Sequence, residues 1–163
     1  MDFFNWEKFI RSVYLRKNIN EIYPLISTAG GITKWFIGEA KYVSNDGIER
    51  KLDEFIQSRD SYVWKWYHKN FGLEGNVLEA NGKDFVKFTF GDAGTVSIKL
   101  SEENSKTFFE LTQEVYPDKP YYHQAHSHCY ACWTFFLNNL KTVTEHNIDL
   151  RETESTNESL VNI

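Results

Sequence analysis

The residues with the most obvious chemical potential lie in one ten-residue stretch in the last third of the chain. It holds three of the five histidines and both cysteines: His123, His126, His128, Cys129 and Cys132. Imidazoles and thiolates are common zinc ligands, and two cysteines separated by two residues form the pattern of a redox dithiol. The stretch could therefore be a metal site, a redox centre or one wall of a larger structure.

The spacing gives a zinc site little support. Zinc needs about four protein ligands, and one helix supplies about two of them, at positions i and i+3 or i+4. Cys129 with Cys132 and His128 with Cys132 meet this spacing, but the other ligands would have to come from elsewhere. His68 is the one further histidine expected to reach, and the chain has no second Cys or His pair. We predict that the chain holds no metal and no cofactor. Histidines such as His126 are expected to lie in solvent or at a helix edge.

The position of the cysteines also disfavours a redox dithiol. A reactive C-x-x-C motif stands at a helix N-terminus directly after a strand, where the helix dipole lowers the pKa of the first thiol. Here the expected helix begins near Pro120, so Cys129 lies well inside it. A buried cysteine behaves mostly as a small hydrophobic residue. We therefore expect the cysteines to form part of a packed helix face.

The helix that carries this stretch is expected to run from about Pro120 to His146. At 100° per residue, one apolar stripe follows it over six turns. His123 projects opposite the stripe, and His126 and His128 lie at its two margins. The residues of the stripe are Tyr122, Ala125, Cys129, Cys132, Trp133, Phe136, Leu140 and Val143.

The N-terminal part reads as a strand followed by short helices. Residues 6–15 are rich in β-branched and aromatic types, which favours a strand. Asn18 and Glu21 form a capping box, although Asn20 as the cap would place Pro24 in the first turn, where proline is tolerated. Two glycines at 30–31 are expected to end this helix. A second short helix or turn then buries Trp35 and Phe36.

Short strands separated by turn signals follow. They are expected over residues 39–43, 61–68, 75–80, 84–90, 95–100 and 107–116. Apolar and polar side chains alternate in most of them, as in antiparallel strands with one buried and one solvated face. The order of elements predicts an α+β domain over residues 1–151, with a polar tail at 152–163. If the sheet is curved, the long helix closes it and leaves a cavity.

The aromatic content supports a heavy core or an aromatic-lined cavity. The chain has 13 Phe, 9 Tyr and 5 Trp in 163 residues. Gln113 is an inward amide among apolar neighbours, so it must bond to a neighbour or to a ligand. The ligand-binding residues that we predict are Trp35, Tyr62, Trp64, Trp66, Phe88, Phe90, Gln113, Cys129, Trp133 and Phe136. Plain core packing is the alternative for the strand residues among them.

Charge and composition exclude several classes of partner. The net charge is −5, whereas nucleic-acid binding and attraction to anionic lipid need a basic surface. No stretch approaches the roughly 20 apolar residues of a membrane span, and no leader is visible. Two cysteines do not form a disulfide framework, so a cytoplasmic location with reduced thiols is expected. The sequence does not fix an oligomeric state.

The order of several weak motifs resembles a known family. These are FIRSVYL, NINEIY, GITKWF, SYVWKWY with G-x-V-L-E-A, and CWTFFLNNLKTV leading to IDLR, across residues 6–151. Together they resemble the START-like (SRPBCC) superfamily, and within it the group named for homology to the activator of heat-shock protein 90 ATPase. Trp133, Leu137 and Leu140 match a pattern typical of its last helix. The resemblance implies a helix-grip fold: a curved antiparallel sheet wrapped around the C-terminal helix, with a hydrophobic cavity between them.

The expected function is therefore binding rather than catalysis. No Ser-His-Asp or Cys-His order suggests a nucleophile, and the GDAG and GKD sequences are turns rather than phosphate loops. The favoured hypothesis is a carrier that binds a hydrophobic or amphipathic small molecule, or a lipid, in a cavity between the sheet and the C-terminal helix. A chaperone-type interaction module and a cyclase-like or hydrolase-like enzyme are the alternatives. An open cavity with neutral lining favours the carrier, a closed one favours the interaction module, and a deep carboxylate or histidine favours the enzyme.

Overall fold

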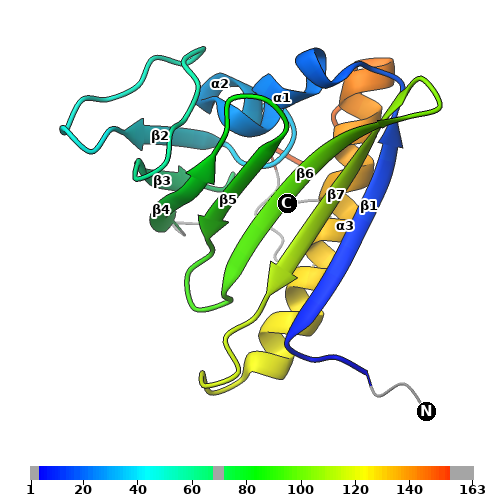
Figure 1. The fold of residues 1–163 in the computed structure, drawn as a ribbon. Coiled ribbons are helices and arrows are strands. Elements are labelled where there is room, and N and C mark those ends of the chain that lie inside the picture. The colour runs from blue at the N-terminus through cyan, green and yellow to red at the C-terminus, as the bar shows by residue number, and fades with distance from the viewer. Residues whose placement is uncertain (1–3, 68–71, 155–163) are drawn as a thin grey trace.

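The structure, a computed structural model, describes residues 4–67 and 72–154. Within these ranges the chain forms one seven-stranded sheet and three helices (Figure 1). The strands are β1 (Lys8–Leu15), β2 (Glu39–Val43), β3 (Ser61–Lys65), β4 (Gly72–Ala80), β5 (Phe85–Thr89), β6 (Thr95–Glu103) and β7 (Lys106–Glu114). The helices are α1 (Ile19–Ser27), α2 (Ala29–Ile32) and α3 (Tyr122–His146).

The sheet is antiparallel throughout and wraps around α3. Its strand order is β1-β7-β6-β5-β4-β3-β2, so the first strand pairs with the last and the remainder is a meander. In Figure 1, α3 runs behind β7 and β1, and α1 and α2 lie on the side of the C-terminal end of α3. This arrangement confirms the predicted α+β helix-grip fold.

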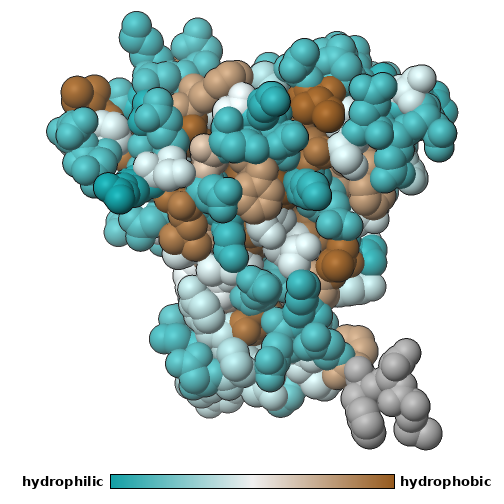
Figure 2. Space-filling model, viewed as in Figure 1, coloured by the Kyte–Doolittle hydropathy of each residue, from teal (hydrophilic) through white to brown (hydrophobic). Residues whose placement is uncertain are grey.

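The strand register produces the buried face that the alternation predicts. Val96 pairs with Gln113, and Ile98 pairs with Leu111, and all four side chains are buried. The opposite face is mostly hydrophilic, with apolar residues scattered singly across it (Figure 2). Such a face needs no covering layer, so α3 and the core pack on one side of the sheet alone.

The capping box at the start of α1 forms as predicted from Asn18. The Asn18 side chain accepts a hydrogen bond from the backbone N–H of Glu21 at 3.0 Å, and the Glu21 carboxylate accepts one from the backbone N–H of Asn18 at 3.2 Å. The alternative cap at Asn20 is wrong. Pro24 therefore lies inside the helix, beyond the first turn, and the helix accommodates its missing N–H.

The break between the first two helices lies at Thr28, not at the glycine pair. Thr28 is extended, ends α1 and caps α2, its hydroxyl accepting a hydrogen bond from the N–H of Gly31 at 2.9 Å. Both glycines are inside α2. A Cβ on Gly31 would lie 1.9 Å from the Pro24 carbonyl oxygen, so the glycine permits close contact between the helices. The expected burial of Trp35 and Phe36 is confirmed, at 0% and 2% exposure.

A buried amide in α3 fastens the segment that follows the helix. Asn139 is fully buried and donates to the Trp35 carbonyl oxygen at 2.8 Å. The side-chain oxygen of Asn139 accepts a hydrogen bond from the backbone N–H of Leu150 at 2.7 Å. The helical projection did not identify this residue. Its role explains why an amide occurs among apolar neighbours, because it joins three separate segments of backbone.

Arg151 completes this attachment. Its guanidinium donates to the carbonyl oxygens of Ile37 and Thr33, each at 2.9 Å, and pairs with Asp149 at 2.7 Å. Burial raises the pKa of Asp149, but hydrogen bonds and charge from Arg151 outweigh burial, so the net pKa is lowered. Residue 151 is thus packed into the domain, while most of the predicted tail, residues 155–163, lies outside the described residues.

Candidate ligand cavity between the sheet and the last helix

A cavity of about 920 Å³ lies against the N-terminal half of α3. Its opposite wall comes from the ends of β3 and β4 and from the turn between β5 and β6, and its rim includes the loop before α3. The cavity is open, because Tyr121, Gln124, His128 and Ala131 line it and are also exposed. This volume is at the upper end of the range for small-molecule sites, roughly 300–1,000 Å³.

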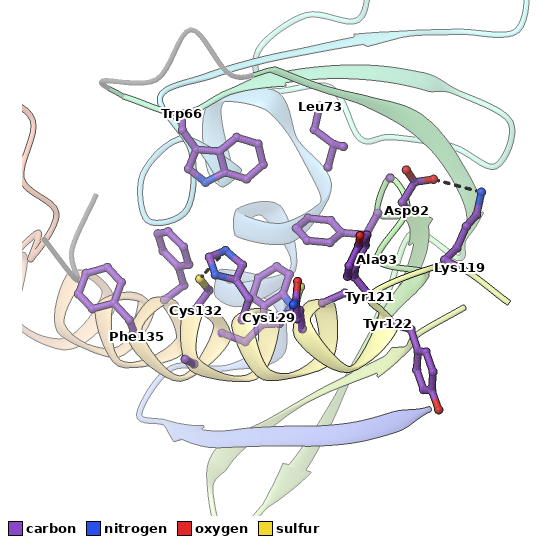
Figure 3. Close-up of a pocket in the computed structure, with 18 of the residues that line it drawn as sticks. Trp66, Leu73, Asp92, Ala93, Lys119, Tyr121, Tyr122, Cys129, Cys132 and Phe135 are labelled. Carbon is purple, nitrogen blue, oxygen red and sulfur yellow. Dashed lines mark hydrogen bonds and ion pairs between the residues drawn. The ribbon is translucent and has the colours of Figure 1, made fainter. Parts of the chain in front are cut away.

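The side chains on the two walls face each other across this space. In Figure 3, Cys129 and Cys132 lie along α3, and Trp66 and Leu73 lie across the cavity from them. Trp66 follows β3 directly, and Leu73 is the second residue of β4. Because the cross-strand pairs of β3 and β4 include Trp64 with Leu73, the sheet holds this wall in place.

The inner end of the cavity is aromatic. Phe36 stacks on Trp133 with ring centroids 4.7 Å apart, and Phe136 packs edge-on against Phe36 at 4.8 Å. Phe90 also contacts Trp133, at 5.5 Å. These four side chains line the cavity, and Phe36, Trp133 and Phe136 are at most 4% exposed. The surface that a ligand would meet at this end is therefore apolar, flat and stiff.

Gln113 fixes the aromatic wall and the neighbouring turn without reaching the cavity. Its side-chain oxygen accepts a hydrogen bond from Trp133 Nε1 at 2.7 Å, and its Nε2 donates to the Ala93 carbonyl oxygen at 2.9 Å. Gln113 itself is 0% exposed. The inward amide predicted from β-strand alternation is thus satisfied by protein neighbours, and it positions two elements that do line the cavity.

The structure separates the ten predicted ligand-binding residues into two groups. Five line the cavity: Trp66, Phe90, Cys129, Trp133 and Phe136. The other five are not part of the lining: Trp35, Tyr62, Trp64, Phe88 and Gln113. The lining also includes Phe36, Leu73 and Phe135, which were not predicted as ligand contacts. A helical or strand projection finds the inward face but does not say how far each inward side chain lies from a hollow.

The aromatic residues of β3 belong to the core. Tyr62 stacks on Trp64 at 4.1 Å, and Phe88 meets Trp64 edge-on at 5.2 Å. The Tyr62 hydroxyl donates to the Thr89 carbonyl oxygen, and Trp64 Nε1 donates to the Tyr42 hydroxyl at 3.2 Å. Their ring faces and polar atoms are already engaged by protein. A ligand would have to displace these contacts to reach them.

Trp35 is also a core residue. It is 0% exposed, and its Nε1 donates to the Leu25 carbonyl oxygen at 2.9 Å. It packs at the α1–α2 end of the fold, where it contacts Phe109 edge-on at 6.3 Å. Its predicted role as a ligand contact is therefore not supported by its position.

The two cysteines occupy different environments although both line the cavity. Cys129 is 5% exposed, and burial raises the pKa of its thiol to about 11. Cys132 is half-buried, and its sulfur lies 3.4 Å from His128 Nε2. Both are thiols rather than disulfide partners. Among residues 4–67 and 72–154, no group of three or more His, Cys, Asp or Glu could hold a metal ion. His68 lies outside the described residues.

Charged groups in the described lining are confined to the rim. Lys119 pairs with Asp92 at 3.3 Å, and the Asp92 side chain is 89% exposed. Asp92 is the one carboxylate among the described residues that line the cavity, and His128 is exposed. The inner wall is therefore neutral over the part of the chain that the structure describes.

His126 is buried, which corrects the prediction that it lies at a solvated helix edge. It is 2% exposed and is surrounded by the rings of Phe4, Trp6, Phe9 and Tyr130, with centroids 5.0–6.2 Å away. Its Nε2 has no hydrogen-bond partner among the described residues. The projection missed this because Phe4 and Trp6 cover a second side of α3. This cluster lies apart from the cavity lining.

We expect the His126 cluster to make folding stability depend on pH. Burial lowers the pKa of His126, because the imidazolium is poorly solvated there. A hydrogen bond that the imidazole donates to the Asn5 backbone opposes this effect, and the nearby His123 adds to it. Because the pKa of His126 is lower in the folded chain than in the unfolded chain, protonation of His126 destabilises the fold. The contribution of neutral His126 to the free energy of unfolding is therefore fully present above the ordinary pKa of 6.5 and is lost as the pH falls below it.

The measurement is the urea midpoint of the natural protein and of His126→Phe between pH 5 and pH 8. The midpoint of the natural protein should fall more steeply below pH 6.5 than that of the variant, since phenylalanine keeps the aromatic packing without a titrating group. Equal slopes would show that His126 does not titrate differently in the folded and unfolded chains.

In overall fold, the structure is similar to several solved proteins. Protein SSP2350 from Staphylococcus saprophyticus matches with a TM-score of 0.69 at 14% identity, over 88% of this chain and 96% of that one. The Aha1 dimer from Colwellia psychrerythraea matches with a TM-score of 0.65 at 16% identity, over 85% and 96%. The AHSA1-like protein from Aeromonas hydrophila matches at 0.59 and 13%, over 91% and 99%.

These matches confirm the predicted resemblance at the level of fold. The chain has the helix-grip architecture of the Aha1-like and AHSA1-like structures, and each match spans most of both proteins. No family model matches the chain, and no curated protein matches it. No helix in the described ranges is long and apolar enough to cross a membrane.

Proposed function

We propose that the chain binds a hydrophobic or amphipathic small molecule in the cavity between its sheet and α3. The observation that carries this proposal is the cavity itself: about 920 Å³, open at one side, with an aromatic inner wall. Burial of apolar ligand surface there would contribute about 25 cal/mol per Å². The Lys119–Asp92 pair and the exposed Gln124 stand at the rim, where the polar end of an amphipathic ligand would remain hydrated.

Binding is better supported than catalysis as the use of this cavity. Neither a carboxylate nor a histidine is buried in the described lining, since Asp92 and His128 are both exposed. An acid or base that works on a bound substrate usually lies within hydrogen-bond reach of the reacting atoms and has a tuned pKa. A neutral, open cavity favours a carrier or a sensor.

The second candidate is a chaperone-type interaction module. It is favoured by the match to a protein named Aha1 in Colwellia psychrerythraea, which covers 96% of that chain. A direct test is the ATPase rate of heat-shock protein 90 with and without the purified chain. A rate increase that persists when the cavity is blocked would support this function in place of the carrier.

The carrier function is tested by blocking the cavity from its helical wall. Ala131 lines the cavity and is exposed on α3, so Ala131→Trp should fill the space without disturbing the core. We expect N-phenyl-1-naphthylamine, an apolar fluorescent probe, to bind the natural protein and to bind Ala131→Trp at least about tenfold more weakly, a loss of roughly 1.4 kcal/mol. Fluorescence titration measures both.

The matched control is Ser127→Trp, which adds the same side chain to an exposed position of α3 outside the lining. It should bind the probe like the natural protein. Equal binding by both variants, or no binding by the natural protein, would contradict the carrier function. Native mass spectrometry of the protein purified from cells would then identify a retained ligand in the positive case.

A further inference from the structure

A cysteine and a histidine form a close pair on the cavity wall. Cys132 Sγ and His128 Nε2 are 3.4 Å apart, one turn from each other on α3 (Figure 3). Both residues line the cavity, and neither is fully buried. The sequence spacing identified them as a candidate ligand pair for zinc, but the described residues supply no third ligand. The pair therefore needs another chemical interpretation.

The contact is of the kind that activates a thiol. The thiolate is the nucleophilic form of cysteine, and a neighbouring imidazole can take the thiol proton and stabilise the thiolate as an ion pair. The exposure of His128 allows it to carry the resulting positive charge in contact with water. Cys132 thus has an accessible base within hydrogen-bond distance.

Cys129 provides an internal comparison. It lines the same cavity three residues earlier, but it is 5% exposed and burial raises the pKa of its thiol to about 11. At neutral pH its thiolate fraction is therefore very small. One cavity thus contains a buried thiol and a more accessible thiol that lies beside a histidine.

The surroundings of Cys132 suit an apolar molecule. Trp66 and Leu73 face it from the opposite wall (Figure 3). Phe135 and Phe136, one turn further along α3, line the same cavity. A molecule held by these side chains would bring its reactive carbon to the sulfur at a high effective concentration. Conjugate addition needs nothing beyond a thiol, a proton carrier and an electron-poor double bond, all of which this arrangement and its ligand supply.

We propose that Cys132 and His128 form a covalent capture site for apolar α,β-unsaturated carbonyl compounds. His128 takes the thiol proton, and the sulfur lone pair forms a C–S bond to the β-carbon. The C=C π electrons move to the α-carbon, which receives the proton from the imidazolium. The adduct contains every atom of both reactants, and no oxidant or reductant takes part. The inference rests on the proposed function, because the apolar cavity must first bind the molecule.

The test compares 3-nonen-2-one with methyl vinyl ketone, which lacks the apolar tail, by peptide mapping with mass spectrometry. The addition should occur at Cys132 and not at Cys129, and 3-nonen-2-one should show a larger rate advantage over methyl vinyl ketone than it does with free glutathione. Cys132→Ser should give no cysteine adduct. Modification of both cysteines to the same extent, or no preference for the longer ketone, would overturn the inference.

The role of His128 is tested by the pH dependence of the rate. We expect the rate of the natural protein to level off at a lower pH than that of His128→Gln, which should be about tenfold slower near pH 7 because its thiolate forms without a base. His146→Gln is the matched control, since His146 is exposed at the other end of α3. Identical pH profiles for natural protein and His128→Gln would remove His128 from the site.

A saturated ketone separates this inference from the proposed function. 2-Nonanone has the same chain as 3-nonen-2-one but cannot add a thiol, so its effect on tryptophan fluorescence reports binding alone. If 2-nonanone binds and 3-nonen-2-one does not modify Cys132 selectively, covalent capture is wrong and the carrier function stands. If 2-nonanone does not bind and no selective adduct forms, both proposals fail for this ligand class.

Discussion

Replacing Trp64 by alanine should lower the free energy of unfolding by about 3–5 kcal/mol, the usual cost of truncating a buried tryptophan. Trp64 is 1% exposed, stacks on Tyr62 and contacts Phe36 and Phe88. Its removal would also leave the buried Tyr42 hydroxyl without the hydrogen bond that Trp64 Nε1 donates to it. The expected fall in melting temperature is on the order of 10 °C.

Trp66→Ala is the control, because the two tryptophans are two residues apart and differ in position. Trp66 is half-buried and lines the cavity, so its truncation should cost clearly less stability but weaken binding of the apolar probe. Thermal unfolding and probe titration on both variants separate the two roles. If Trp64→Ala melted like the natural protein, the division between core and lining residues would be wrong.

Arg151→Met should destabilise the chain by about 2–4 kcal/mol although it alters a residue beyond the last helix. The change leaves the Ile37 and Thr33 carbonyl oxygens without their donor, and each unsatisfied buried group costs about 1–3 kcal/mol. It also removes the cation that lowers the pKa of Asp149. Urea unfolding, monitored by circular dichroism, measures the loss.

The matched control for this variant is Arg16→Met. The Arg16 side chain is 73% exposed and lies 3.9 Å from the Glu145 carboxylate. In the variant, Glu145 would still pair with Lys141, which lies 3.0 Å from it. Because the Arg16 end of this pair lies in solvent, and Glu145 also accepts hydrogen bonds from the Arg16 backbone N–H and from Lys141, losing the pair should cost at most about 1 kcal/mol. Equal losses for the two variants would show that the segment after α3 is not anchored through Arg151.

Most of the fold was predictable because it depends on periodicity. Alternation along β6 and β7 identified the buried face, including Gln113, and the 100° projection identified Cys129, Trp133 and Phe136 on the inner face of α3. These patterns arise from local geometry, which every residue of an element shares. The capping box at Asn18 was readable for the same reason, since its two hydrogen bonds span three residues.

The errors have a common physical cause, which is contact between parts distant in sequence. His126 is buried because Phe4 and Trp6 cover it, and Asn139 is buried because it binds backbone around Trp35 and Leu150. Neither contact leaves a periodic signal. The helix break at Thr28 was missed because glycine usually ends a helix, whereas here Gly31 serves the close approach of Pro24.

The candidate site was predictable only in part, because a cavity is a property of packing. Trp64 and Trp66 face the same way in the β3 pattern, yet the first is covered on all sides and the second borders open space. The difference depends on how Phe36 and Phe136 fill the volume between sheet and helix. Side-chain direction can be read from the sequence, whereas the residual space between side chains cannot.

The two hydrogen bonds of Gln113 have a consequence for the width of the cavity. One amide ties the helical wall, through Trp133, to the turn that carries Asp92, through Ala93. The separation of these two borders is therefore set inside the core, by a buried side chain outside the cavity lining. Widening the cavity on this side would require breaking both bonds in a buried environment. This border of the cavity is therefore rigid, and Gln113 is the position at which a substitution would change the width of the cavity.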